Sequence, residues 1–183
     1  MRTLVAAFFL FIAGLVSADE LVPICHGYSC FVQDEIHYSS AQIAAVGQRL
    51  NATVDAPAER KILAKVIGQL YAWAGEQSDV KNDRGGNYAD GSTPGKMDCI
   101  DHSTSTTRLL KMLEANGFLR WHRVSAIDVR YWALVFPAHY SAVIEEKAEG
   151  GGHFVVDSWF VDNGQPAVIL PLDEWKKGAG PNV

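Results

Sequence analysis

Three absences limit what this chain can be: it has no apolar run long enough to cross a membrane, no excess of basic residues and few cysteines. The longest apolar stretch, residues 4–16, has 13 residues, whereas a membrane-spanning helix needs about 20. No other run approaches that length, so we expect no transmembrane segment in the mature protein. The 16 basic residues are outnumbered by 21 acidic ones, which argues against nucleic acid and acidic membrane surfaces as partners.

The beginning of the chain has the features of a secretory signal. Arg2 supplies a positive charge, the apolar stretch follows, and small residues at 16–18 offer a cleavage site before Asp19. This order predicts a signal peptide over residues 1–18 and a periplasmic or secreted mature protein. Residues 19–183 contain no repeat or linker and are enough for one domain with its own core. We expect this domain to be a monomer.

The three cysteines are Cys25, Cys30 and Cys99. An exported protein meets an oxidising environment, so we predict a disulfide between Cys25 and Cys30, which are close in sequence. Their spacing is not the Cys-x-x-Cys of redox enzymes, which disfavours a redox function. Cys99 is then left over. It is either a buried structural residue, behaving as a small hydrophobe, or a nucleophile.

Helix signals dominate the first two thirds of the mature chain, after an N-terminal segment (residues 19–39) that we expect to be irregular. Three helices are predicted, each after a residue that caps helix N-termini: residues 40–50 after Ser39 or Ser40, a helix after Asp55, and residues 99–116 after Asp98. Gly117 is suited to end the third helix. A long polar loop, residues 78–96, leads to Asp98, and loops of this length are often functional.

After Gly117 the apolar pattern changes to a period of two, which predicts strands. The predicted strands are Phe118–Val124, Tyr131–Phe136, His139–Glu146, His153–Phe160 and Ala167–Leu170, with a short helical segment at Asp173–Lys177. Helices followed by consecutive strands indicate an α+β domain in which N-terminal helices pack on an antiparallel sheet.

Three residues in this layout suit nucleophilic catalysis. Cys99 is expected at a helix N-terminus, where the helix dipole should lower the pKa of its thiol. His139 opens a strand and can serve as the base. Asp157 lies within an apolar strand, where a carboxylate is costly unless it is paired. A cysteine, a histidine and an aspartate in these places correspond to nucleophile, base and orienting group.

A simple register connects the histidine to the aspartate. If residues 147–149 form a three-residue turn, the two strands pair so that His139 lies opposite Asp157. Cross-strand neighbours lie about 5 Å apart, within reach of a hydrogen bond. A slip of one residue would move Asp157 to the other face of the sheet. His153 shares a face with Asp157 and is a rival base on the same strand.

The segment from residue 97 to residue 160 resembles the transglutaminase-like branch of the papain-type fold, and is most similar to the exported bacterial transglutaminase-like cysteine proteinases. The features that carry the resemblance are Asp98-Cys99-Ile100-Asp101 at the start of a helix, Ala138-His139 at the start of a strand, Phe154-Val-Val-Asp157 at the end of an apolar strand, and Leu119-Arg120. The resemblance implies a papain/transglutaminase-like core, a periplasmic location and catalysis by Cys99, His139 and Asp157.

The chain departs from that family in two ways. Some members bind calcium through acidic residues on both sides of the cysteine; Ile100 replaces one of them here, which leaves Asp98 and Asp101 as calcium candidates and implies no cofactor otherwise. The segment from Asp101 to Thr107 is also rich in hydroxyl groups where such helices are normally apolar. That composition indicates either a polar contact within the site or a locally solvated face.

The function that these features predict is thiol-dependent chemistry at an amide bond in a protein or peptide substrate. Cys99 would attack the carbonyl to form a thioester, with water as acceptor in a peptidase or amidase and an amine in an acyl transferase. The Cys99 backbone N–H would help to bind the oxyanion, with Gln77 or Tyr88 as second donor.

Two alternatives remain open. The domain can be a catalytically inactive binding module of the same fold. Cys99, Asp101 and His102 lie within one helical turn and offer three metal ligands, although a structural zinc site requires a fourth.

Overall fold

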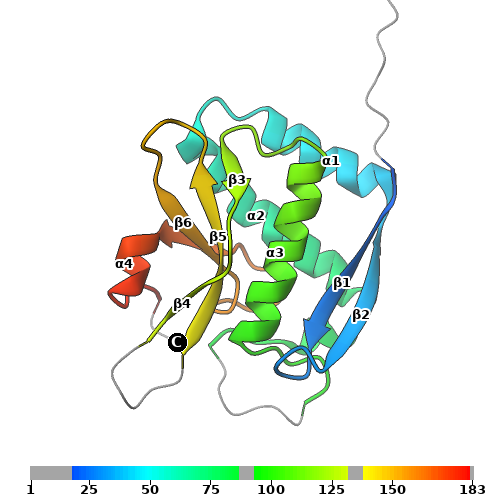
Figure 1. Ribbon diagram of the computed structural model, residues 1–183. Coiled ribbons are helices and arrows are strands. Elements are labelled where there is room, and N and C mark those ends of the chain that lie inside the picture. The colour runs from blue at the N-terminus through cyan, green and yellow to red at the C-terminus, as the bar shows by residue number, and fades with distance from the viewer. Residues whose placement is uncertain (1–17, 87–92, 132–137, 182–183) are drawn as a thin grey trace, which may run out of the picture.

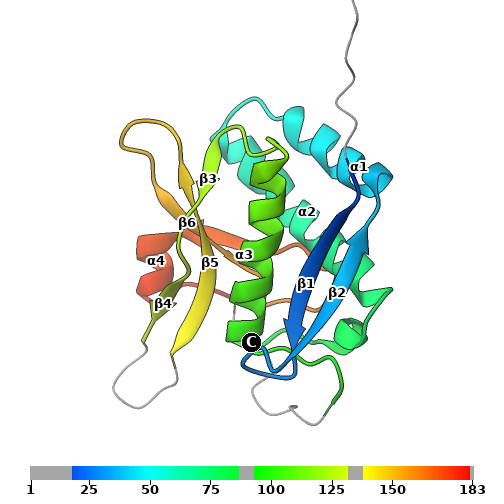
Figure 2. The same ribbon diagram turned by 45° about the vertical axis from the view of Figure 1, so that its right-hand side comes forward.

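The computed structural model describes residues 18–86, 93–131 and 138–181 and has the predicted α+β class, with four helices and antiparallel strands (Figures 1 and 2). Three expectations lie outside these residues: nearly all of the signal peptide, Tyr88, and the strand expected after Tyr131. Within the described residues, no helix is both long and apolar enough to cross a membrane.

The N-terminal segment forms a two-stranded hairpin, and the prediction that residues 19–39 are irregular is wrong. Strand β1 (Glu20–His26) pairs antiparallel with β2 (Val32–Tyr38). The inward side chains, Val22, Ile24 and Ile36 among them, are buried in the core. Pro23 and the polar residues of β2 obscured this alternation in the sequence.

Both helices that follow were predicted. Helix α1 (Ser40–Asn51) is capped by Ser39, whose side chain accepts from the backbone N–H of Gln42 while the Gln42 side chain accepts from the Ser39 N–H. Helix α2 (Ala56–Gly75) is capped by Asp55. A short 3-10 helix, η1 (Asp79–Asn82), lies within the region expected to be loop.

Helix α3 (Cys99–Ala115) lies between the hairpin on one side and the main sheet on the other (Figures 1 and 2). Asp98 caps it, as predicted, by accepting from the N–H groups of Ile100 and Asp101. Gly117 follows the helix with a φ of 74°, a left-handed conformation that favours glycine. The helix therefore begins at Cys99, as the sequence predicted.

The main sheet has the order β3-β5-β6-β7, and β4 pairs with the other end of β5 on the β3 edge. Its strands are β3 (His122–Val124), β4 (Asp128–Arg130), β5 (His139–Glu146), β6 (His153–Asp157) and β7 (Val168–Pro171), followed by helix α4 (Leu172–Lys176). The bounds of β5 match the prediction. Strands β3 and β6 are shorter than predicted, and β4 was not predicted.

Buried side chains form two clusters on opposite faces of this sheet. Ala142, Ile144 and Val156 belong to the large cluster that includes the helices and the hairpin. Val143 and Val155 belong to a smaller cluster with Trp159, Phe160 and Trp175 on the α4 side. Successive strand residues point to opposite faces, so the smaller cluster shares its face with His139 and Asp157.

The register between β5 and β6 differs by two residues from the prediction. Val143 pairs with Val155 and Ala142 with Val156, because the loop spans residues 147–151 instead of a three-residue turn. Asp157 is therefore not directly across from His139. A shift of two residues keeps the alternation of faces, whereas a shift of one reverses it, and so both side chains still share a face.

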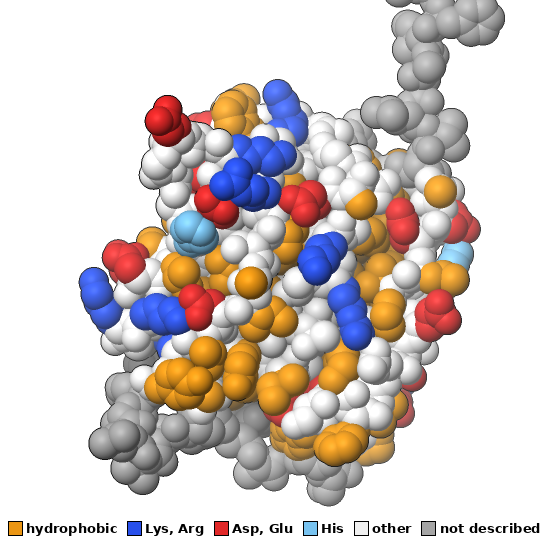
Figure 3. Space-filling model, viewed as in Figure 1, with side chains coloured by type: hydrophobic (Ala, Val, Ile, Leu, Met, Phe, Trp, Pro, Cys, Tyr) orange, Lys and Arg blue, Asp and Glu red, His pale blue; other side chains and the backbone are white. Residues whose placement is uncertain are grey.

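The surface viewed in Figure 3 carries both signs of charge. Lysine and arginine side chains lie among acidic ones on the upper part of this face, and apolar side chains gather on its lower part, toward the end of the molecule where α3 begins (Figures 1 and 3).

Candidate active site

His139 and Asp157 form a buried polar pair on the α4 side of the sheet. His139 begins β5 and Asp157 ends β6, and His139 Nε2 lies 2.7 Å from Asp157 Oδ2. Their exposed fractions are 8% and 2%. A buried carboxylate needs hydrogen-bonding partners, and this contact fixes which ring nitrogen faces it.

Two further donors reach the Asp157 carboxylate. The indole Nε1–H of Trp175 donates to Oδ2 at 3.0 Å, and the backbone N–H of Trp159 donates to Oδ1 at 3.2 Å. Trp175 was not among the residues predicted for this site. The signal available in the sequence was a tryptophan in the short C-terminal helix, because a buried tryptophan needs an acceptor for its N–H and Asp157 needs a donor.

Aromatic rings surround the His139 imidazole. Its ring centroid lies 4.8 Å from that of Trp159, 5.5 Å from Phe160 and 5.6 Å from Trp175. Such walls lower the local polarity, and a hydrogen bond is stronger in a medium of low polarity than in water. The rings therefore strengthen the His139–Asp157 contact and hold the imidazole in place.

Cys99 lies at the first position of α3, beside the beginning of β5. Its thiol donates to the carbonyl oxygen of Ala138, with the sulfur 3.7 Å from that oxygen, and its side chain packs against the smaller apolar cluster. The sulfur is thus held by the backbone carbonyl directly before His139.

Burial raises the pKa of the Cys99 thiol above its ordinary value. Hydrogen bonding from the Tyr140 backbone lowers the pKa, but the Asp98 and Asp157 carboxylates raise it further. The expectation that the helix N-terminus lowers this pKa is therefore wrong for the structure as it stands. The loss of hydrating water outweighs the backbone hydrogen bonds that favour the thiolate.

Sulfur and imidazole are not hydrogen-bonded to each other in this structure. Nε2 of His139 faces Asp157, so Nδ1 is the nitrogen available to a thiol, and within the described part of the chain Nδ1 has no hydrogen-bonding partner. The single thiol proton is directed at Ala138. A contact between Cys99 and His139 therefore requires the thiol to turn away from that carbonyl.

The other candidates for base and oxyanion donor lie elsewhere. His153 is about half exposed and lies beside Glu145, with Nε2 at 3.7 Å from a carboxylate oxygen. The side-chain amide of Gln77 bonds to the backbone N–H and carbonyl of His37 in β2. These bonds stabilise the edge of the hairpin and use both the oxygen and the nitrogen of the Gln77 amide. Tyr88 lies outside the described residues.

The two calcium candidates, Asp98 and Asp101, bind the turn of the N-terminal hairpin. Asp101 accepts from the N–H groups of Tyr28, Cys30 and Asp98, and the second oxygen of Asp98 accepts from Ser29. All four carboxylate oxygens therefore already accept backbone donors. These two residues do not fit a calcium site, which needs free oxygens directed at one point.

The turn that these carboxylates hold is unusual. Gly27, Tyr28, Ser29 and Cys30 all have positive φ, between 53° and 78°, a conformation that is unfavourable for residues other than glycine. The predicted disulfide joins Cys25 to Cys30 across this turn. Burial raises the pKa of Asp101 to about 6.

The hydroxyl-rich stretch of α3 is buried, which favours a polar contact over the alternative of a solvated face. Ser105 Oγ accepts from the backbone N–H of Cys25 at 2.8 Å, and Thr106 Oγ1 lies 2.9 Å from Ser158 Oγ. Ser103 and Thr107 bond back to carbonyls of their own helix. The polar side chains thus connect α3 to the hairpin and to the segment after Asp157.

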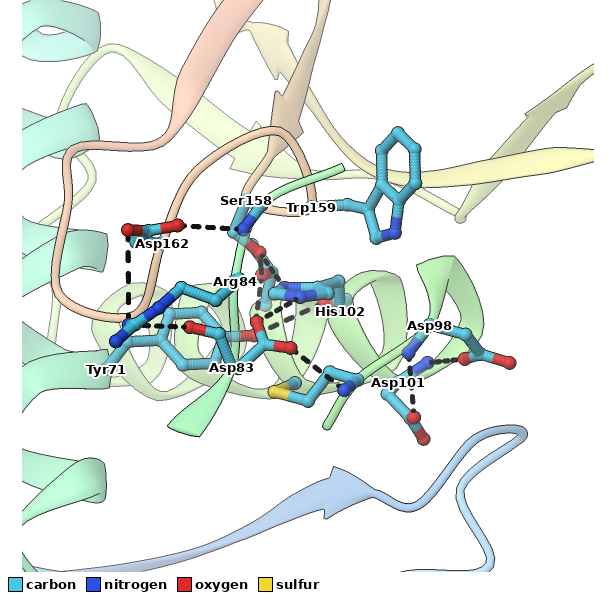
Figure 4. A network of polar contacts seen from close by, with 12 residues as sticks. Tyr71, Asp83, Arg84, Asp98, Asp101, His102, Ser158, Trp159 and Asp162 are labelled. Atoms are coloured by element: carbon cyan, nitrogen blue, oxygen red, sulfur yellow. Dashed lines mark hydrogen bonds and ion pairs between the residues drawn. The ribbon is translucent and has the colours of Figure 1, made fainter. Parts of the chain in front are cut away.

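His102 belongs to the same network, shown in Figure 4. Its Nδ1 lies 2.8 Å from Ser158 Oγ and its Nε2 lies 3.0 Å from Asp83 Oδ2. Cys99, Asp101 and His102 therefore bond to three different groups and do not converge on a metal. Among the described residues, the only cluster with metal-ligand geometry is Cys25, Cys30 and Asp101, whose two sulfurs are joined to each other.

Comparison of the chain with protein-family models, with curated proteins and with solved structures found no match.

Proposed function

We propose that this protein is an exported thiol enzyme that acts on amide bonds of a protein or peptide substrate, with Cys99 as nucleophile, His139 as base and Asp157 as the orienting group. The observation that carries the proposal is the buried 2.7 Å contact between His139 and Asp157, with the Cys99 sulfur hydrogen-bonded to the carbonyl of Ala138, the residue directly before the histidine. The likeness of residues 97–160 to the transglutaminase-like cysteine proteinases, and a papain/transglutaminase-like core, belong to the same proposal.

The geometry supports a defined sequence of steps. When the thiol turns from Ala138 to His139 Nδ1, the imidazole takes its proton and the sulfur attacks the substrate carbonyl carbon. The C–N bond then breaks, and the imidazolium gives its proton to the leaving amine. Asp157 stabilises the imidazolium through Nε2, and water or an amine releases the acyl group. Apo structures often show catalytic hydrogen bonds that form only with substrate.

Because the pKa of the Cys99 thiol is raised, we infer that most of the activation of this nucleophile comes from His139. Burial and two carboxylates oppose the thiolate at Cys99, so its ionisation depends on a base that takes the thiol proton. Removing His139 should therefore slow the reaction strongly. General-base catalysis of this kind contributes about 10²- to 10⁴-fold in rate.

The test uses p-nitrophenyl acetate with the mature, oxidised protein, in which Cys99 is the free thiol. Attack by Cys99 breaks the ester bond and yields S-acetyl-Cys99 and p-nitrophenol, which absorbance and mass spectrometry detect separately. His139→Gln and Asp157→Asn should each slow acetylation of Cys99 by roughly a hundredfold. His153→Gln is the matched control and should leave the rate unchanged.

A second candidate function, an inactive binding module of the same fold, is favoured by one observation: the thiol proton is directed at the Ala138 carbonyl and not at His139. In a binding module, Cys99 would react with the ester no faster than a free thiol, and His139→Gln would change nothing. That result would overturn the enzyme proposal.

The proposed location rests on the leader-like residues 1–18 and on the disulfide between Cys25 and Cys30. Disulfides persist in the periplasm and outside the cell and are rare in the cytosol. The interspersed charges and the net charge of −5 give no support to a nucleic-acid partner.

A further inference from the structure

Behind the candidate catalytic residues lies a second histidine–aspartate pair that the proposed chemistry does not use. His102 and Asp83 have exposed fractions of 4% and 1%. His102 lies on α3, one helical turn after Cys99, and its backbone N–H donates to the Asp98 carbonyl. Asp83 lies on the segment that follows η1. The pair is therefore built into the interior next to the candidate nucleophile.

The two polar atoms of the His102 ring reach two different segments. Nδ1 contacts the hydroxyl of Ser158, the residue directly after Asp157, and Nε2 contacts Asp83 (Figure 4). The other oxygen of Asp83 accepts from the backbone N–H of Met97, two residues before Cys99. One imidazole thus connects the helix of Cys99, the chain leading to it, and the segment that carries Asp157.

The segment after Asp157 is held by a set of hydrogen bonds, of which the contacts of Ser158 with His102 and Thr106 come first along the chain. It leaves the sheet at Asp157, and Trp159 turns back to donate its N–H to the Asp157 carboxylate. The carbonyl of Trp159 accepts from Gly86, which lies close in sequence to Asp83. The contact between His102 and Ser158 is thus well placed to set the orientation of the carboxylate.

We propose that His102 is a positioning residue for this site: through Ser158 it fixes the Asp157 carboxylate, and through Asp83 it fixes the approach to Cys99. This inference rests on the proposed function for its effect on rate, but not for its effect on the His139–Asp157 contact. The His102 ring is buried and both of its nitrogens have partners, which is what a histidine in the interior of a protein requires.

Three substitutions separate the two contacts. An asparagine amide reaches about as far as Nδ1 and a glutamine amide about as far as Nε2. His102→Asn should therefore keep the bond to Ser158, His102→Gln should keep the bond to Asp83, and His102→Ala loses both. Thr107→Val is the matched control, because it removes a buried hydroxyl of the same helix that bonds to the Ser103 carbonyl and not to His102.

The first readout is the imidazole N–H proton of His139, observed by NMR and identified by its loss in His139→Gln. We expect the downfield signal of the hydrogen-bonded proton in the wild type and in Thr107→Val, a weakened signal in His102→Gln, and its loss in His102→Ala. His102→Asn should restore it. Ser158→Ala provides a second route to the same loss if His102→Ala does not fold.

The second readout is acetylation of Cys99 by p-nitrophenyl acetate, compared with the stability of each variant in urea. His102→Ala should slow acetylation by roughly ten- to a hundredfold, because small misplacements of a catalytic group have effects of this size, and Thr107→Val should not. If the NMR signal depends on His102 but the wild type is not acetylated, the positioning role stands and the enzyme proposal fails. If the signal persists in both His102→Ala and Ser158→Ala, or if Thr107→Val loses it as well, the positioning role is overturned.

Discussion

Asp157 is a carboxylate with only 2% of its surface exposed, and it depends on its neighbours for every hydrogen bond that water would otherwise supply. One of those neighbours is Trp175, whose indole N–H shares Oδ2 with His139. At the scale of single residues, the cost of losing a donor depends on whether its acceptor remains buried.

Substitutions at two tryptophans, one with a paired N–H and one without, test this dependence. Trp175→Phe leaves the buried carboxylate short of a donor and should lower the free energy of unfolding by about 2 kcal/mol or more. Trp121 has a buried Nε1 with no hydrogen-bonding partner among the described residues. Trp121→Phe removes an unsatisfied donor together with part of the ring, so we expect a loss of about 1 kcal/mol or less.

Urea denaturation monitored by circular dichroism measures both variants. Equal losses for the two substitutions would show that the volume of the indole, and not its N–H group, determines the contribution of Trp175. A loss of the His139 N–H signal only in Trp175→Phe would connect the same hydrogen bond to the candidate active site.

At the scale of elements, the hairpin turn and the beginning of α3 depend on each other. Three consecutive N–H groups of the left-handed turn point at the carboxylates of Asp98 and Asp101, the residues that also cap the helix. Helix N-terminal carboxylates normally serve only their own helix. Here they also accept from three N–H groups of a turn that belongs to another element.

Asp101 gives this dependence a pH signature. Burial raises its pKa from 3.8 to about 6, so between these values the folded chain retains a proton that the unfolded chain has lost. Stability from this group is therefore complete below about pH 3.8 and falls as the pH rises toward 6. In Asp101→Asn this titration is absent, and the stability difference between wild type and variant should shrink over that range.

Urea titrations at several pH values between 4 and 6 test this expectation. Asp173→Asn, which changes an exposed carboxylate on α4, is the control. Parallel stability curves for the wild type and Asp101→Asn across this range would contradict the prediction.

At the scale of the whole molecule, a buried group of charges joins the helices to the sheet. Glu59 of α2 is fully buried and accepts from the backbone N–H groups of Arg120, Trp121 and His122, and its carboxylate contacts the His122 ring. The neighbouring Arg60 pairs with Glu146 of β5. One turn of α2 therefore positions the chain where it enters the sheet.

Replacing Glu59 should have a large effect because its partners stay buried. Glu59→Gln places an amide N–H₂ among backbone donors, and we expect a loss of about 3 kcal/mol or more in the free energy of unfolding. Glu145→Gln, which breaks an exposed pair with Arg123, should change stability little. Similar midpoints in urea for Glu59→Gln and the wild type would contradict this account.

Local signals in the sequence were sufficient for much of the fold. The caps Ser39, Asp55 and Asp98 predicted the starts of three helices, and the strand from His139 to Glu146 was predicted with its bounds. These features depend on residues a few positions apart. The hairpin of residues 20–38 was missed because its polar outward residues and Pro23 interrupt the alternation, and its stability comes from packing against α3.

The proximity of His139 to Asp157 was predicted, but the register of their strands and the state of the Cys99 thiol were not. Alternation along two strands was enough to place His139 and Asp157 on one face, although the register was wrong by two residues. The state of the Cys99 thiol was predicted incorrectly, because burial depends on groups far away in the sequence. For the same reason, the bond from Trp175 to Asp157 and the pairing of His102 with Asp83 and Ser158 were not predicted.

The hairpin turn is held by bonds of short and of long range in the sequence. The disulfide that crosses the turn closes a loop of five positions, whereas the bonds from the turn to Asp98 and Asp101 join residues 69 to 73 positions apart. Closing the longer loop costs more chain entropy. The hairpin turn and the start of the Cys99 helix share these hydrogen bonds, so that a change in either element removes partners from the other.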